Sequence, residues 1–256
     1  MPFKKYLLWL AIAIIFILTL FFLWPAGNKQ PKPLSVLTIE PTEKHTATVI
    51  FLHGSCDNAS NWQVNLRQIA INHPQVKFII PQAPTISVSM NYGLPMPAWY
   101  NIKGNIKDIE NLKQDKEGLL KSVRQIEKII QGEINNGIKP EKIIVAGHSQ
   151  GASVALTLGL ISNHPLAKIM CLSGFLPCRE EIFEWAKEEN KTIPFLFYHK
   201  KSDNMVPFLV GEKSAELLRD KGYQTEFKKV EENYLRGHFY DYLEAEEIFK
   251  RQLKNS

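Results

Sequence analysis

The chain has 256 residues, 45% hydrophobic and 22% charged, which is enough for one large globular domain and a short additional segment. Its net charge of +5 comes from dispersed lysines, with no clustered arginine or aromatic nucleic-acid motif, which argues against a nucleic-acid partner. Its three cysteines, Cys56, Cys171 and Cys178, form no C-x-x-C pair, so neither a disulfide framework nor a zinc site is indicated.

The first part of the chain is apolar. Tyr6 to Trp24 is a run of nineteen residues without a charge. At about 1.5 Å per residue, a helix of this length crosses a hydrocarbon core of about 30 Å. Residues 1–25 are therefore predicted to form an uncleaved transmembrane anchor, followed by a linker at 26–33. The terminal amine favours a cytoplasmic N-terminus, which places the remaining chain on the non-cytoplasmic side. A cleaved signal peptide and a secreted product are the alternative.

From residue 34 onward, apolar β-rich runs alternate with helical patterns. Strands are predicted near residues 35–39, 46–52, 76–80, 143–146, 168–172, 194–198 and 224–229. Helices are predicted near residues 61–72, 115–135, 150–162, 180–189, 207–221 and 239–253. This alternation predicts an α/β domain over 34–256, with a mostly parallel central sheet and helices on both faces.

The stretch from Pro81 to Asp108 interrupts the alternation. Its prolines and apolar residues show no clear period. A long apolar loop beside a catalytic site can bind an acyl chain, which makes Met90, Leu94, Met96 and Trp99 candidate substrate-binding residues. The alternative is a loop that only covers the core.

The motif Gly147-His148-Ser149-Gln150-Gly151 lies between a predicted buried strand and a predicted helix of small and apolar residues. A G-x-S-x-G on such a strand-to-helix turn lifts the serine Oγ clear of the sheet and directs the next backbone N–H at an oxyanion. Ser149 is therefore the candidate nucleophile, and the Gln150 N–H is a candidate oxyanion donor. An inert serine in a glycine-rich turn is the alternative reading.

A serine nucleophile needs a base and a carboxylate, which in this type of sheet follow in the order serine, acid, histidine. His238 lies in a loop between the last predicted strand and helix, where an imidazole can serve as general base and then general acid. Asp203 follows the carboxyl end of a parallel strand, where catalytic groups of open α/β sheets gather, whereas Asp220 falls near a helix end. The alternative for His238 is a surface histidine in a turn, and the alternative for Asp203 is an aspartate that serves only an Asx turn.

A second oxyanion donor is expected where the strand near 46–52 runs into His53-Gly54-Ser55. A His-Gly pair after an early strand commonly supplies it, which points to the backbone N–H of Ser55. His53 itself is expected to hold the loop.

Six short sequence blocks follow one another along the chain in the same order as in a known protein family. They are Phe51-Leu-His-Gly-Ser-Cys-Asp-Asn58, Pro81-Gln-Ala-Pro-Thr85, Met96-Pro-Ala-Trp-Tyr100, Ala146-Gly-His-Ser-Gln-Gly151, Leu172-Ser-Gly-Phe-Leu-Pro177 and Asp203-Asn-Met-Val-Pro207. From Thr46 to the C-terminus, the chain thereby resembles the phospholipase/carboxylesterase family of α/β-hydrolases, which includes acyl-protein thioesterases and lysophospholipases. The resemblance implies an α/β-hydrolase fold, a triad of Ser149, Asp203 and His238, oxyanion donors at Ser55 and Gln150, and an acyl-binding lid loop over 81–108.

Three positions depart from the family pattern. Lys200 follows His199 where the family usually has glycine, and Asn101 stands where an aspartate often follows the Trp-aromatic pair. Cys56 stands where the oxyanion loop often has glycine. If that position needs a positive φ, Cys56 is expected to shift the loop.

The sequence thus predicts a membrane-tethered serine hydrolase that cleaves carboxylic esters or thioesters through an acyl-enzyme. The resemblance implies small acyl esters, lysophospholipids or S-acylated proteins as substrates. No metal or cofactor is implied, and the oligomeric state is not indicated. The alternative is a catalytically inactive hydrolase fold that serves as a membrane-anchored binding protein, with Cys56 spoiling the oxyanion loop.

Overall fold

The computed structural model describes residues 33–104, 106–108, 112–179, 181–231 and 237–253. The predicted anchor at 1–25, and the predicted linker apart from Pro33, lie outside the described residues. Among the residues that are described, no helix has the length and apolar character needed to cross a membrane. From Leu34 onward the chain forms one compact unit.

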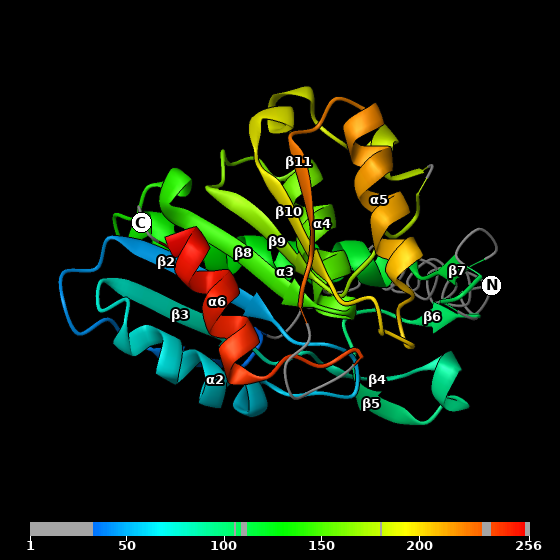
Figure 1. Cartoon of the computed structure of the whole chain (residues 1–256), viewed down its shortest axis with the longest axis horizontal. Helices are drawn as coiled ribbons and strands as arrows, with labels where there is room; N and C mark the ends of the chain where they lie inside the picture. Colours follow the sequence, from blue (N-terminus) through cyan, green and yellow to red (C-terminus); the bar gives the residue numbers. More distant parts are fainter. Residues whose placement is uncertain (1–32, 105, 109–111, 180, 232–236, 254–256) are drawn as a thin grey trace, which may run out of the picture. The chain divides into compact units, whose positions relative to one another are not determined.

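A seven-stranded sheet forms the centre of this unit (Figure 1). In spatial order its strands are β1 (Val36–Ile39), β3 (Val76–Pro81), β2 (Ala47–Leu52), β8 (Ile143–His148), β9 (Lys168–Leu172), β10 (Phe195–His199) and β11 (Thr225–Lys229). Only β1 runs antiparallel to its neighbour, β3, and the other neighbouring pairs are parallel. The predicted mostly parallel sheet is therefore confirmed.

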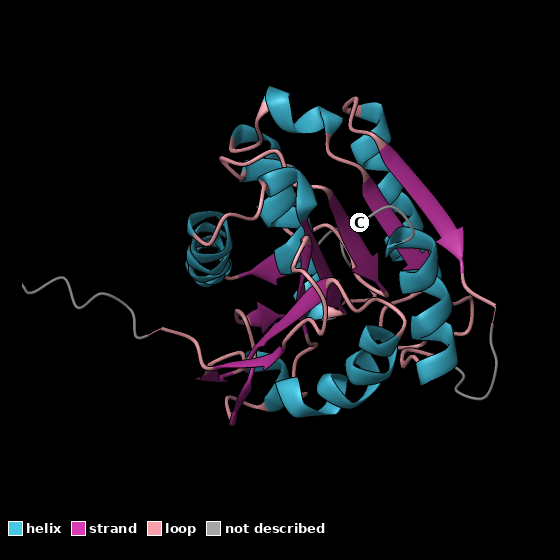
Figure 2. Cartoon of the chain, turned by 90° about the vertical axis from the view of Figure 1, so that its left-hand side faces the viewer, coloured by secondary structure: helices cyan, strands magenta, loops and turns pink. Residues whose placement is uncertain are grey.

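Helices cover both faces of the sheet (Figure 2). The helices α2 (Ala59–Ile71) and α6 (Tyr242–Leu253) pack on one face, and α3 (Lys116–Asn135), α4 (Gln150–Ile161) and α5 (Phe208–Asp220) pack on the other. Alternate residues of one strand serve the two layers: in β2, Val49 and Phe51 join the core under α2 and α6, while Ile50 and Leu52 join the core under α3, α4 and α5. Because β2 is buried on both faces, it reads as a continuous apolar run.

The predicted helix at 180–189 is wrong. Two short 3-10 helices, η3 (Glu181–Glu184) and η4 (Glu188–Thr192), occupy the region instead. Lys187 between them is extended, with φ −104° and ψ 136°, and its N–H donates to Leu160 O of α4 at 2.9 Å. This tertiary hydrogen bond replaces the bond that a continuing helix would have made.

The aperiodic stretch from Pro81 to Asp108 contains short antiparallel ladders. The strands β4 (Thr85–Ser87) and β5 (Pro95–Pro97) form a hairpin around the 3-10 helix η1 (Ser89–Asn91), and β6 (Ile102–Lys103) pairs with β7 (Lys113–Gln114). Each ladder spans only two or three residue pairs, which is too short to show a period in the sequence.

Candidate active site

Ser149 forms the sharp turn between β8 and α4. Its backbone has φ 54° and ψ −120°, a region that residues with a Cβ rarely occupy. Its N–H donates to Leu172 O of β9 at 2.9 Å, and its side chain makes no capping bond to α4. The strained turn expected from G-x-S-x-G is therefore present, and the serine hydroxyl is not used to cap the helix.

The two glycines of the motif allow α4 to pass close to the sheet. A Cβ on Gly151 would lie 2.1 Å from Leu52 O, and a Cβ on Gly147 would lie 2.4 Å from the carbonyl carbon of Gly151. Both contacts are to backbone atoms, which cannot rotate away as a side chain can. Glycine is thus required on either side of the serine.

The loop after β2 lies against the serine. A Cβ on Gly54 would lie 3.2 Å from the Cβ of Ser149, so Ser55 follows the point of closest approach. His53 holds this loop: its Nδ1–H donates to Gly54 O at 2.7 Å, and its Nε2 accepts from the Ala83 N–H at 3.1 Å. Burial lowers the pKa of His53, which favours the neutral imidazole that this pair of bonds requires.

Cys56, at the position where a glycine was expected from the family resemblance, has a positive φ of 62°. Its N–H donates to Pro97 O of β5 at 2.8 Å, and its side chain is exposed. The chain therefore adopts the left-handed conformation here despite its Cβ, and the loop is tied to the β4–β5 hairpin.

Replacing Cys56 by glycine is expected to raise the free energy of unfolding by about 0.5–1 kcal/mol, because a residue with a Cβ is strained in the left-handed region. Urea unfolding at neutral pH measures the change. Cys56→Ala is the matched control, since alanine removes the thiol but keeps the Cβ. An equal gain from both variants would show that the thiol, and not the backbone conformation, was responsible.

Asp203 and His238 are brought together at the carboxyl end of β10. His238 Nδ1 donates to Asp203 Oδ2 at 2.8 Å, and both side chains are buried. Asp203 Oδ1 accepts from the N–H groups of Met205 and Val206 at 3.0 and 2.9 Å. The Asx-type turn read as an alternative for Asp203 thus coexists with the bond to the imidazole.

Asp203 is strongly biased toward its ionised form. Burial alone would raise the pKa of its carboxyl group, but hydrogen bonds with His199 and His238, and with the Val206 N–H, hold the pKa well below its usual range. His199 Nε2 lies 3.3 Å from Asp203 Oδ2 and donates to Val206 O at 2.9 Å. The sequence signal for His199 was only its place at the end of a strand. Asp220, by contrast, is exposed.

His148 supports the segment that carries His238, a role the sequence did not indicate. Its Nε2–H donates to the backbone carbonyl of His238 at 2.8 Å, and the centroids of the two rings are 4.6 Å apart. Burial, aided by the nearby His238, lowers the pKa of His148 to about 3, so this imidazole is neutral at physiological pH. Because His148 directly precedes Ser149, the contact places the histidine segment next to the serine turn.

The four candidate substrate-binding residues fall into two groups. Met90 and Leu94 are exposed on the β4–β5 hairpin, and Met96 is half-buried beside them. Trp99 is only 2% exposed. Its indole N–H donates to His53 O at 2.7 Å, and its backbone N–H donates to Gln150 Oε1 at 2.9 Å. Trp99 therefore connects the loop after β2 to the start of α4.

Asn101 anchors the hairpin. Its Oδ1 accepts from the Ser89 N–H at 2.8 Å, and its Nδ2 donates to Ser89 Oγ at 3.0 Å. The amide uses both a donor and an acceptor, whereas an ionised aspartate has only acceptors. The departure from the family pattern at this position thus fits its partner on η1.

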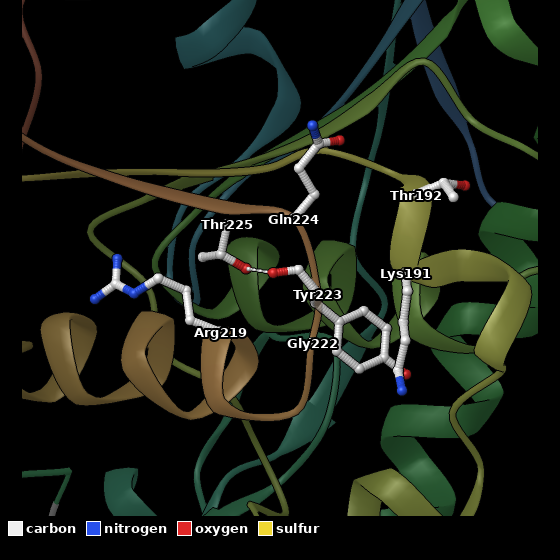
Figure 3. A pocket seen from close by; sticks show the side chains of 7 residues that line it. All are labelled: Lys191, Thr192, Arg219, Gly222, Tyr223, Gln224 and Thr225. Carbon is white, nitrogen blue, oxygen red and sulfur yellow. Dashed lines mark hydrogen bonds between the residues drawn. The ribbon is translucent and has the colours of Figure 1, made fainter.

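A separate surface pocket is lined by Lys191, Thr192, Arg219, Gly222, Tyr223, Gln224 and Thr225 (Figure 3). Thr225 begins β11, and Gln224 O accepts from the N–H of Phe195, which begins β10. The pocket is therefore at the amino ends of these strands, whereas Ser149, Asp203 and His238 gather at the carboxyl ends. Across the described residues, no group of three or more His, Cys, Asp or Glu side chains could hold a metal ion.

Comparison with known proteins identifies the family. Residues 35–243 match the Phospholipase/Carboxylesterase family. The chain belongs to this family. Acyl-protein thioesterase 1 of Cryptococcus neoformans is 35% identical over 196 residues, which cover 76% of this chain and 82% of that protein. Acyl-protein thioesterase 1 homolog 2 of Dictyostelium discoideum is 39% identical over 184 residues, covering 70% and 80% of the two chains.

The solved structure of Zea mays acyl-protein thioesterase 2 matches this family member with a TM-score of 0.74 and 30% identity, covering 86% of this chain and 98% of that one. The α/β-hydrolase fold and the family resemblance are therefore confirmed. This phospholipase/carboxylesterase family member is an acyl-protein thioesterase-like hydrolase.

Proposed function

We propose that this family member is a serine hydrolase that cleaves carboxylic esters or thioesters through an acyl-enzyme on Ser149. The observation that carries the proposal is a serine on a strained strand-to-helix turn whose preceding residue, His148, is hydrogen-bonded to the backbone of His238, while the His238 side chain is bonded to the buried Asp203. A nucleophile, a base and a group that orients the base are the three parts that acyl transfer requires.

In the proposed reaction, His238 is the general base. Its Nδ1–H is held by Asp203, so Nε2 is the nitrogen that accepts the proton of Ser149 Oγ. Asp203 stays ionised, because its pKa is held well below the usual range, and it stabilises the imidazolium that forms. The same proton then passes to the departing alcohol or thiol.

The oxyanion of the tetrahedral intermediate accepts hydrogen bonds from the backbone N–H groups of Ser55 and Gln150. Gln150 is the first residue of α4, where backbone N–H groups have no partner within the helix. The Gly54–Ser55 backbone lies against Ser149 from the opposite loop. Each such donor typically contributes about 3–4 kcal/mol of transition-state stabilisation.

The acyl-enzyme is resolved by water. Having given its proton to the leaving group, His238 takes a proton from water, and the hydroxide attacks the acyl carbon. The imidazolium then donates that proton to Ser149 Oγ as the Oγ–acyl bond breaks, which releases the carboxylic acid and restores the serine. The apolar side chains of Met90, Leu94 and Met96 are the proposed contacts for the acyl chain. Small acyl esters, lysophospholipids and S-acylated proteins all contain the acyl carbonyl group that this reaction requires.

Labelling with a fluorophosphonate tests the proposal, because the reagent phosphonylates only an activated serine. The expected result is stoichiometric labelling whose tryptic peptide carries the adduct on Ser149. Paired substrates that differ only in an oxygen ester or a thioester then rank the two classes. Folded protein that neither takes the label nor hydrolyses either substrate would support a binding protein without catalysis.

We also propose that residues 1–25 tether the enzyme to a membrane, with the catalytic domain on the non-cytoplasmic side. The support is the uncharged run from Tyr6 to Trp24. The expected result is full-length protein that stays in the membrane fraction after carbonate extraction and is released by detergent. N-terminal sequencing that starts beyond Trp24 would instead establish a cleaved signal peptide.

A further inference from the structure

Lys200 is a fully buried lysine in the loop that follows β10. Its side chain is 0% exposed, and its Nζ donates to Phe239 O at 2.6 Å and to Glu244 Oε2 at 2.7 Å. The same ammonium lies 5.0 Å from the ring centroid of Tyr240. Lys200 thus links the β10–α5 loop to the segment that leads from His238 into α6.

Among the described residues, three hydrogen bonds join the two segments. They run from Lys200 Nζ to Phe239 O, from Gly237 N–H to Ser202 Oγ at 2.7 Å, and from His238 Nδ1 to Asp203 Oδ2 at 2.8 Å. The backbone of His238 is therefore fixed on both sides, through the residue before it and the residue after it. The imidazole reaches Asp203 only if this register is kept.

Glu244 extends the linkage to the start of α6. Its Oε2 accepts from Lys200 Nζ and from the Asp241 N–H at 2.9 Å, while its own N–H donates to Asp241 Oδ1 at 2.9 Å. A buried ion pair contributes little net stability, because desolvation of both charges offsets their attraction. The pair is better explained by the geometry that it maintains.

We propose that Lys200, with Glu244 as its counter-ion, is a positioning residue that holds His238 in register with Asp203 and Ser149. This inference rests on the proposed function, since it assigns Lys200 to the placement of the general base. A displacement of about 1 Å at such a base lowers the rate by about 10²-fold. The described contacts of Lys200 are to a backbone carbonyl, its counter-ion and the Tyr240 ring, so its replacement is expected to change the rate and to leave substrate affinity nearly unchanged.

Kinetics of full-length Lys200→Met in detergent test the proposal, with Lys201→Met as the matched control because Lys201 is the exposed neighbour. For Lys200→Met, kcat and the rate of fluorophosphonate labelling fall by about 10-fold to 100-fold, while KM changes less than about twofold. For Lys201→Met all three values stay at the wild-type level. A kcat of Lys200→Met within twofold of wild type would overturn the proposal.

The double variant Lys200→Met/Glu244→Gln separates positioning from stability. Lys200→Met alone leaves the buried Glu244 carboxylate without its lysine counter-ion and lowers the melting temperature by about 10 °C. The added Glu244→Gln removes that charge, and its amide oxygen still accepts from the Asp241 N–H, so the melting temperature recovers while kcat stays low. Recovery of kcat together with the melting temperature would reduce Lys200 to a structural role and overturn the proposal.

A spectroscopic readout keeps the test independent of turnover. The Nδ1 proton of His238, bonded to Asp203, gives a downfield NMR signal in wild type and in Lys201→Met. In Lys200→Met this signal shifts upfield or broadens by exchange with water. If wild type shows the signal but no hydrolysis, the proposed function fails, while an unchanged signal in Lys200→Met overturns the positioning role.

Discussion

Replacing Ser149 by alanine is expected to lower kcat by about 10⁴-fold to 10⁶-fold and to abolish fluorophosphonate labelling, because the acyl-enzyme has no other oxygen on which to form. The slow hydrolysis that remains in the variant then reflects only the oxyanion donors and substrate binding. The measurement is steady-state hydrolysis of an oxygen ester and its thioester analogue by purified full-length protein.

The stability of the same position gives an internal control. Alanine keeps the Cβ and the strained φ of 54°, so the melting temperature of Ser149→Ala stays at the wild-type value. Ser149→Gly removes the activity equally but is expected to gain about 1 kcal/mol of stability, because glycine tolerates that conformation. Ser60→Ala, at an exposed serine on α2, should change neither property. Substantial hydrolysis by Ser149→Ala would assign the nucleophile elsewhere.

Asp203→Asn is expected to lower kcat by about 10⁴-fold at neutral pH. An amide at this position donates to Nδ1 of His238 and places the imidazole proton on Nε2, where it blocks removal of the serine proton. Asp220→Asn is the matched control, since Asp220 is exposed on the last turn of α5. Equal kcat in Asp203→Asn and wild type would exclude Asp203 as the orienting group.

The same substitution has a pH-dependent effect on stability. The pKa of the Asp203 carboxyl group lies below its usual range in the folded protein, so its ionised form stabilises the fold above the unfolded-state pKa near 4. This contribution is lost as the pH falls through the folded-state pKa. Urea unfolding is therefore expected to show Asp203→Asn as less stable than wild type at pH 7, with the difference shrinking below about pH 4.

The inner strands of the sheet were predictable as apolar runs because they are buried on both faces. In β8 all the residues from Ile143 to His148 are buried, so the strand reads as an unbroken apolar run. The serine turn was also predictable, since the glycines at 147 and 151 are required by contacts within one strand–turn–helix unit and the adjacent strand. Short-range geometry of this kind leaves a local sequence signal.

The prediction of a helix at 180–189 was wrong because a non-local contact, and not the local sequence, determines the structure there. Its residues suit a helix, but the Lys187 N–H bonds to Leu160 O, which is distant in sequence. The supporting bonds of the site are similarly non-local: Trp99 Nε1 and His53 O are 46 residues apart, and His148 and His238 are 90 residues apart. A local sequence pattern does not indicate which distant residues form such hydrogen bonds.

The sequence by itself predicted the seven strands of the central sheet, the helices α2 to α6, the family, and Ser149, Asp203 and His238 as the candidate catalytic residues, because hydrophobic periodicity and motif residues are local features of the sequence. Only the tertiary structure decided that Trp99 and His148 support the site from within, that Cys56 accommodates a positive φ, and that Lys200 is buried against the histidine segment. These features depend on which residues, distant in sequence, come into contact in the folded protein. Their hydrogen bonds and their burial are therefore determined by the tertiary structure.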